Sequence, residues 1–107
     1  MDFTRDQVDA LPGATLVEFG ADGCGFCEAA RPLIDELLAE RPALRHLKIE
    51  DGKGRRLGRT FGVKLWPTLI LVHDGSEVAR VVRPRSLGEL RHALYALGQN
   101  SAPTAMP

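Results

Sequence analysis

The 107-residue chain has only two cysteines and one tryptophan, and it has no net charge, because 14 basic residues balance 14 acidic ones. This balance gives no overall attraction to nucleic acid or to an anionic membrane surface. No segment approaches the ~20 apolar residues that cross a bilayer, and residues 1–13 lack the basic and apolar regions of a signal peptide. We therefore expect a cytoplasmic protein without a nucleic-acid or membrane partner.

Both cysteines lie in one short motif, Cys24-Gly25-Phe26-Cys27. In a reducing compartment a cysteine pair is more often catalytic or metal-binding than structural. Cys24 lies just before a predicted helix, where the helix dipole and free backbone N–H groups lower the pKa of a thiol. Cys27 lies one turn inside that helix, within disulfide reach. The spacing is typical of an attacking thiol followed by a resolving thiol.

The same spacing also occurs as half of a zinc site. A structural zinc needs four ligands, and the three histidines, His46, His73 and His92, do not share a ligand-like spacing. A metal or iron–sulfur module would therefore have to share two cysteine pairs across a dimer. A binding module that uses the cysteines only as a redox switch is a further alternative.

The hydrophobic pattern predicts one α/β domain over residues 1–98, followed by a flexible tail at 99–107. A strand, a helix and a strand in that order imply a parallel pair, and Asp74-Gly75 predicts a hairpin turn to an antiparallel strand. Capping boxes at Thr4 and Ser86 open the first and last helices. The predicted strands are 15–19, 44–50, 68–72 and 77–82, and the predicted helices begin near residues 5, 25 and 87.

Several separated landmarks together resemble the thioredoxin family. They are the strand Leu16–Phe19, C-G-F-C at the start of a helix that contains Pro32, the segment "WPT" before a strand, a hairpin and a final helix. The resemblance covers about residues 15–97. It implies a thioredoxin fold, in which helices flank a central mixed sheet of four to five strands.

The resemblance also implies roles for individual residues. Cys24 is similar to the family's nucleophile, and Cys27 to its resolving thiol. Glu18 occupies the position of a buried acid that moves a proton to and from the resolving cysteine, although it could instead be a solvated edge residue. Pro67 is similar to the family's cis-proline, which presents backbone to an extended substrate.

Five positions depart from the family pattern. Gly23 replaces a tryptophan, and Phe26 replaces a proline. The only tryptophan, Trp66, instead precedes the expected cis-proline, where it is either core or substrate contact. His46 replaces a lysine that often partners the buried acid. Arg83 replaces a glycine at the active-site rim, where it could favour the thiolate, select acidic partners or narrow the groove.

The resulting prediction is an enzyme, a thiol–disulfide oxidoreductase that reduces protein disulfides in electron transport and cell redox homeostasis. Its substrate groove is predicted to comprise Gly25, Phe26, Trp66, Pro67 and Arg83. We expect a monomer with no metal and no cofactor of its own, re-reduced by an external donor, either a thioredoxin-reductase-like enzyme or a small thiol. A glutaredoxin-like, glutathione-coupled enzyme is the nearest alternative.

Overall fold

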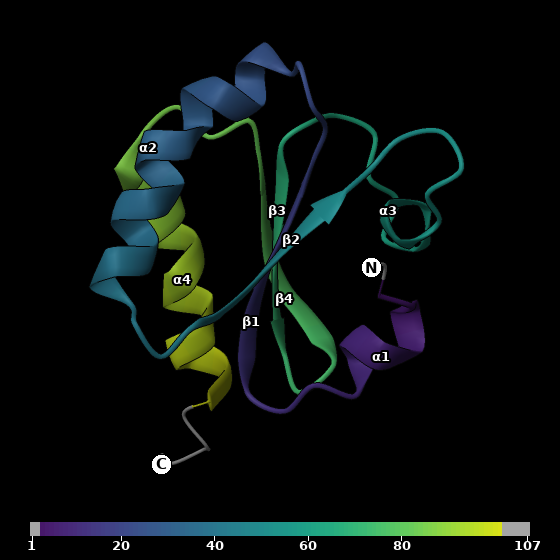
Figure 1. The fold of residues 1–107 in the computed structure, drawn as a ribbon. Helices are drawn as coiled ribbons and strands as arrows, with labels where there is room; N and C mark the ends of the chain where they lie inside the picture. The colour runs from purple at the N-terminus through teal and green to yellow at the C-terminus, as the bar shows by residue number, and fades with distance from the viewer. Residues whose placement is uncertain (1–2, 102–107) are drawn as a thin grey trace.

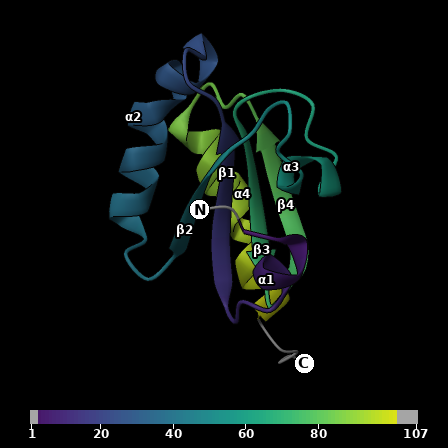
Figure 2. The same ribbon diagram turned by 45° about the vertical axis from the view of Figure 1, so that its right-hand side comes forward.

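The structure, a computed structural model, describes residues 3–101 (Figure 1). Four strands form one mixed sheet in the order β2-β1-β3-β4. Helices α2 and α4 cover one face of this sheet, and α1 and α3 lie on the other (Figures 1 and 2). The strands are β1 (Ala14–Gly20), β2 (Arg45–Glu50), β3 (Thr68–His73) and β4 (Ser76–Val82), and the helices are α1 (Arg5–Asp9), α2 (Gly25–Glu40), α3 (Leu57–Thr60) and α4 (Leu87–Ser101).

The strand directions agree with the sequence prediction. β1 pairs with β2 in parallel, whereas β1 with β3 and β3 with β4 are antiparallel. Asp74 and Gly75 form the two-residue turn between β3 and β4, with φ of 49° and 87°. Two consecutive positive φ values are the mark of a type I′ turn, whose twist matches that of a β-hairpin. The expected mixed sheet flanked by helices is confirmed.

The central strand β1 is buried on both faces, and successive side chains pack on opposite sides of the sheet. Val17 and Phe19 pack on the side of α1 and α3, while Leu16 packs with residues of α2 and α4. Glu18 shares the alternation of Leu16 and is only 2% exposed. The alternative in which Glu18 is a solvated edge residue is therefore wrong, and the α2 side of the core contains a carboxylate.

The helix ends show one correct and one partly wrong prediction. The Thr4 capping box forms in full at α1. At α4, Ser86 Oγ accepts from Glu89 N at 3.2 Å, but the Glu89 carboxylate accepts from Arg85 N rather than from Ser86 N.

α4 continues to Ser101, beyond the predicted domain end at residue 98, and residues 102–107 of the expected tail lie outside the described residues. None of the described helices combines the length and apolar character needed to cross a membrane.

Candidate active site

Cys24 and Cys27 form a disulfide at the start of α2, with their Cα atoms 5.2 Å apart. Cys24 is the N-cap residue of this 16-residue helix, in an extended backbone conformation. Its Sγ accepts a hydrogen bond from Cys27 N at 3.1 Å. After reduction, the same N–H group and the positive end of the helix dipole would stabilise a thiolate on Cys24.

Phe26 and Cys27, neighbours in the motif, have different surroundings. Phe26, between the cysteines, is 55% exposed, whereas Cys27 lies against the end of β1. A Cβ atom at Gly20 would be only 3.0 Å from Cys27 Sγ, which is tighter than side chains normally tolerate. The glycine at this position therefore leaves room for the sulfur of Cys27.

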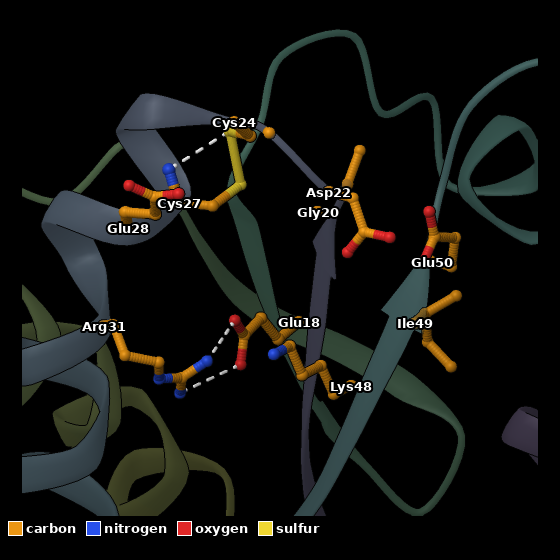
Figure 3. Close-up of a pocket in the computed structure, with 12 residues that line it drawn as sticks. Glu18, Gly20, Asp22, Cys24, Cys27, Glu28, Arg31, Lys48, Ile49 and Glu50 are labelled. Carbon is orange, nitrogen blue, oxygen red and sulfur yellow. Dashed lines mark hydrogen bonds and ion pairs between the residues drawn. A yellow bond between two sulfur atoms is a disulfide. The ribbon is translucent and has the colours of Figure 1, made fainter.

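A pocket of about 460 Å³ lies beneath the disulfide, between α2, β1 and β2 (Figure 3). Both cysteines line it, and so do Glu18 and Arg31, whose side chains point toward each other in the close-up. The other lining residues are Gly20, Ala21, Asp22, Gly23, Glu28, Lys48, Ile49 and Glu50. The buried carboxylate and the sulfur of Cys27 thus open onto one polar space.

Two basic side chains from different elements contact the Glu18 carboxylate. Arg31 of α2 donates to both carboxylate oxygens, at 2.9 and 3.3 Å, and His46 Nε2 of β2 lies 2.8 Å from Oε1. Burial alone would raise the pKa of Glu18, but the hydrogen bonds from His46 and Arg31 and their positive charges outweigh it and hold this pKa below its usual value. The position of His46 agrees with its predicted place beside the acid.

The sequence analysis missed Arg31. Its charge is typical of a solvent-facing helix residue, but its side chain turns toward the sheet and is only 31% exposed. The available signal was its spacing, since Arg31 follows Cys27 by four residues and therefore lies on the same face of the helix, one turn on.

Arg83 joins the loop before β3 to the cysteine motif. The Trp66–Pro67 peptide bond is cis, as expected. Arg83 N donates to Pro67 O at 2.9 Å, and Arg83 Nε donates to Trp66 O at 2.8 Å. The guanidinium lies 3.8 Å from the centroid of the Phe26 ring. Arg83 has φ of 52°, which is unusual for a residue other than glycine, and its contacts offset that strain.

Trp66 is half-buried rather than plain core. Its indole Nε1 donates to Asp51 Oδ2 at 2.8 Å, and its ring lies 3.9 Å from the position a Cβ at Gly52 would take. Asp51 N in turn donates to Gly20 O at 2.8 Å, which links Trp66 to the residue that contacts Cys27. Asp51 is a second residue that the sequence analysis missed. Its only sequence signal is its place at the end of a predicted strand.

Within the part of the chain that the structure describes, three or more His, Cys, Asp or Glu side chains do not gather closely enough to hold a metal ion. The predicted residues instead form two groups. Cys24, Cys27 and Glu18 line the pocket, while Phe26, Trp66, Pro67 and Arg83 are linked through contacts of Arg83. Gly25 opens α2 between these groups.

A helix that begins at a redox-capable cysteine pair, in a mixed four-stranded sheet with a cis-proline before β3, defines a thiol–disulfide oxidoreductase of the thioredoxin fold. The thioredoxin family model matches residues 3–96, and the chain belongs to the thioredoxin family. It is therefore an enzyme that acts on disulfides.

Several known proteins that are similar to this chain are thioredoxins. The structure of thioredoxin 2 from Pseudomonas aeruginosa PAO1 in its reduced form is 55% identical, with a TM-score of 0.81 and 92% of each chain covered. The thioredoxin of Chlamydia muridarum is 43% identical over 70 residues, which are 65% of this chain and 69% of that protein. Thioredoxin NaTrxh from Nicotiana alata is 28% identical, with a TM-score of 0.72 and 85% and 78% of the two chains covered.

Proposed function

We propose that this protein reduces disulfide bonds in other proteins, with Cys24 as the nucleophile and Cys27 as the resolving thiol. The observation that carries the proposal is the position of Cys24 as N-cap of α2, with its sulfur accepting the backbone N–H of Cys27. The sulfur of Cys24 has both this backbone donor and the positive end of the helix dipole to stabilise a thiolate.

The reaction has two exchange steps. The Cys24 thiolate attacks one sulfur of the substrate disulfide, and a mixed disulfide forms as the first substrate thiolate leaves. This thiolate takes a proton from solvent, which balances the proton that Cys24 lost on ionisation. Cys27 then attacks Cys24 Sγ, transfers its proton toward Glu18, and releases the second substrate sulfur as a thiolate that takes up a proton. The substrate gains two electrons and two protons, and the enzyme ends with the Cys24–Cys27 disulfide.

The substrate groove in this proposal runs between the cysteine motif and the cis-proline loop. Gly25 and Phe26 form one side, and Trp66 and Pro67 form the other, where an extended substrate pairs with backbone groups. Two features support this assignment. Leu65, next to Trp66, is 48% exposed and Phe26 is 55% exposed, so each side has an exposed apolar side chain, and Arg83 contacts both sides.

An external donor must restore the dithiol after each turnover. We propose a thioredoxin-reductase-like enzyme or a small thiol for this step, and a cytoplasmic location where such donors keep thiols reduced. The proposed functional unit is a monomer, with residues 1–98 as the catalytic domain and 99–107 as an appended tail whose first residues continue α4 to Ser101.

The trapping of substrates through Cys24 tests the proposed roles of Cys24 as nucleophile and Cys27 as resolving thiol. In Cys27→Ser the first exchange step proceeds and the second cannot, so mixed disulfides should accumulate and disappear on addition of dithiothreitol. Non-reducing gels and mass spectrometry of the adducts measure this outcome. The double variant Cys24→Ser/Cys27→Ser is the control and should trap nothing. Equal trapping by Cys24→Ser alone would contradict the proposal, because Cys27 would then be the attacking thiol.

Arg83 should influence which substrates are reduced fastest. Its guanidinium lies over Phe26 beside the disulfide, so a substrate with an acidic residue next to its cysteine gains a partly exposed charge contact worth ~1 kcal/mol. Arg83→Gln should therefore lower kcat/KM for an acidic peptide disulfide about fivefold relative to a matched basic peptide. The exposed Arg85→Gln is the matched control. An unchanged ratio in Arg83→Gln would show that Arg83 does not select substrates.

A further inference from the structure

Arg31 makes a bidentate contact with the Glu18 carboxylate, and the proposed exchange steps do not require this contact. Arg31 Nη1 lies 2.9 Å from Oε2 and Nη2 lies 3.3 Å from Oε1, so the guanidinium spans the carboxylate. The side chain of Glu18 is only 3% exposed. A carboxyl group buried without partners favours its neutral form, whereas a bidentate guanidinium favours the ionised form.

The orientation of Arg31 is itself fixed. Its Nε donates to Asp35 Oδ1 at 3.1 Å, one turn further along α2, while its terminal nitrogens reach the sheet. Arg31 thus bridges a solvent-exposed carboxylate and a buried one. The net effect on the buried carboxyl is clear, because contacts with His46 and Arg31 hold the pKa of Glu18 below its usual value despite burial.

The groups around Glu18 come from three sides. On the other neighbouring strand, β3, the residue opposite Glu18 is the apolar Leu69, which leaves the polar contacts to α2, β2 and the loop after β1. Lys48 is opposite Glu18 on β2. The titratable or charged groups that contact Glu18 or line the same pocket are Cys24, Cys27, Glu28 and Arg31 of α2 and its cap, His46, Lys48 and Glu50 of β2, and Asp22 of the loop.

We propose that Arg31 is a positioning residue that keeps Glu18 in its carboxylate form throughout the pH range in which the cysteine pair works. This inference rests on the proposed role of Glu18 as the proton acceptor for Cys27. As Cys27 attacks, its S–H proton passes to the Glu18 carboxylate while the bond between Cys24 and the substrate sulfur breaks and the Cys24–Cys27 bond forms. The departing substrate thiolate then takes the proton from Glu18.

Arg31 has two opposite effects on this transfer. It makes Glu18 a weaker base, which slows proton abstraction. It also keeps Glu18 deprotonated at neutral and mildly acidic pH, so that the carboxylate is available to accept a proton. Without the arginine, burial would favour the protonated form of Glu18 more strongly, and the protonated form cannot accept a proton. The consequence is a resolving step whose rate does not follow a Glu18 titration near pH 7.

Carbon-13 NMR of the Glu18 side-chain carboxyl tests the inference directly, in both the oxidised and the reduced protein. In the wild type the carboxylate signal should prevail at neutral pH, with a titration midpoint below the ordinary value for glutamate. In Arg31→Gln the midpoint should move upward by about 1–3 pH units, because the opposite charge is gone and burial remains. Arg31→Lys retains the positive charge but cannot form the bidentate contact, so its carboxyl midpoint should lie between those of the wild type and Arg31→Gln. Arg41→Gln, which removes an exposed arginine from the end of the same helix and leaves Arg31 and Asp35 in place, is the matched control.

Single-turnover release of a peptide from the mixed disulfide supplies the functional readout. The rate for Arg31→Gln should fall as pH drops through its new carboxyl midpoint, and the wild-type rate should not fall there. A wild-type Glu18 that titrates near neutrality, or arginine variants with an unchanged midpoint, would overturn the inference. If Arg31→Gln does not fold, the Glu18 carboxyl midpoint of Arg31→Lys tests the inference instead. The NMR readout needs no reductase activity, so failure of the proposed function is seen separately, as the absence of peptide release at any pH.

Discussion

Replacing Cys24 with serine is expected to lower the rate of protein-disulfide reduction by at least ~10³-fold, the scale on which loss of a catalytic nucleophile acts. In the proposed reaction the sulfur of Cys24 is the nucleophile of the first exchange step and the sulfur attacked in the second, and it accepts the N–H of Cys27 at the start of α2. A serine hydroxyl at this position has the same backbone donor, but it stays protonated at neutral pH and cannot form a disulfide.

The measurement is the reduction of insulin with dithiothreitol as donor, corrected for the rate without enzyme. Asp22→Asn is a suitable control, since Asp22 lines the same pocket but forms no part of the exchange chemistry. Its rate should stay within a few-fold of the wild type. A Cys24→Ser variant that retains more than a tenth of the wild-type rate would contradict the assignment of Cys24 as nucleophile.

The second large effect concerns the strand that positions the site. Phe19 follows Glu18 on β1, is fully buried, and packs against Phe61 with ring centroids 5.8 Å apart. Phe19→Ala removes this contact and leaves a cavity in the core between the sheet and α3. We expect the free energy of unfolding to fall by ~3–5 kcal/mol.

Urea denaturation of the oxidised protein measures this loss as a lower midpoint with an unchanged slope. Phe26→Ala is the matched control, because it removes the same side chain where that side chain is 55% exposed. Its cost should stay below about 1 kcal/mol, which includes the lost contact with Arg83. A loss below about 1 kcal/mol in Phe19→Ala would show that Phe19 does not contribute to the core as the structure indicates.

Much of the fold follows from local signals in the sequence. Asp74-Gly75 predicts a type I′ turn because few other residue pairs accept two positive φ values. Thr4 and Gln7 satisfy each other's backbone donors and fix the start of α1. The position of Cys24 before the apolar pattern of α2 predicts its place as N-cap. These signals act over a few residues, so the sequence alone reveals them.

The parts of the site that the sequence did not predict depend on contacts between segments that are distant along the chain. Arg31 and Glu18 are 13 residues apart and lie on different elements, and the polar character of Arg31 suggested solvent rather than a buried partner. Asp51 binds Trp66 across 15 residues. The contact between Arg83 and Phe26 joins the end of β4 to the start of α2. Hydrophobic periodicity reports whether a side chain is buried, but not which polar group it meets.

A redox titration of the wild-type protein in thiol/disulfide buffers, quantified by alkylation and mass, tests the central claim most directly. The account predicts that Cys24 and Cys27 pass together from dithiol to intramolecular disulfide in one reversible two-electron transition, with a tenfold change in the ratio for each ~30 mV. If the two cysteines formed no intramolecular disulfide at any buffer potential, the dithiol–disulfide cycle on which the whole account rests would be contradicted.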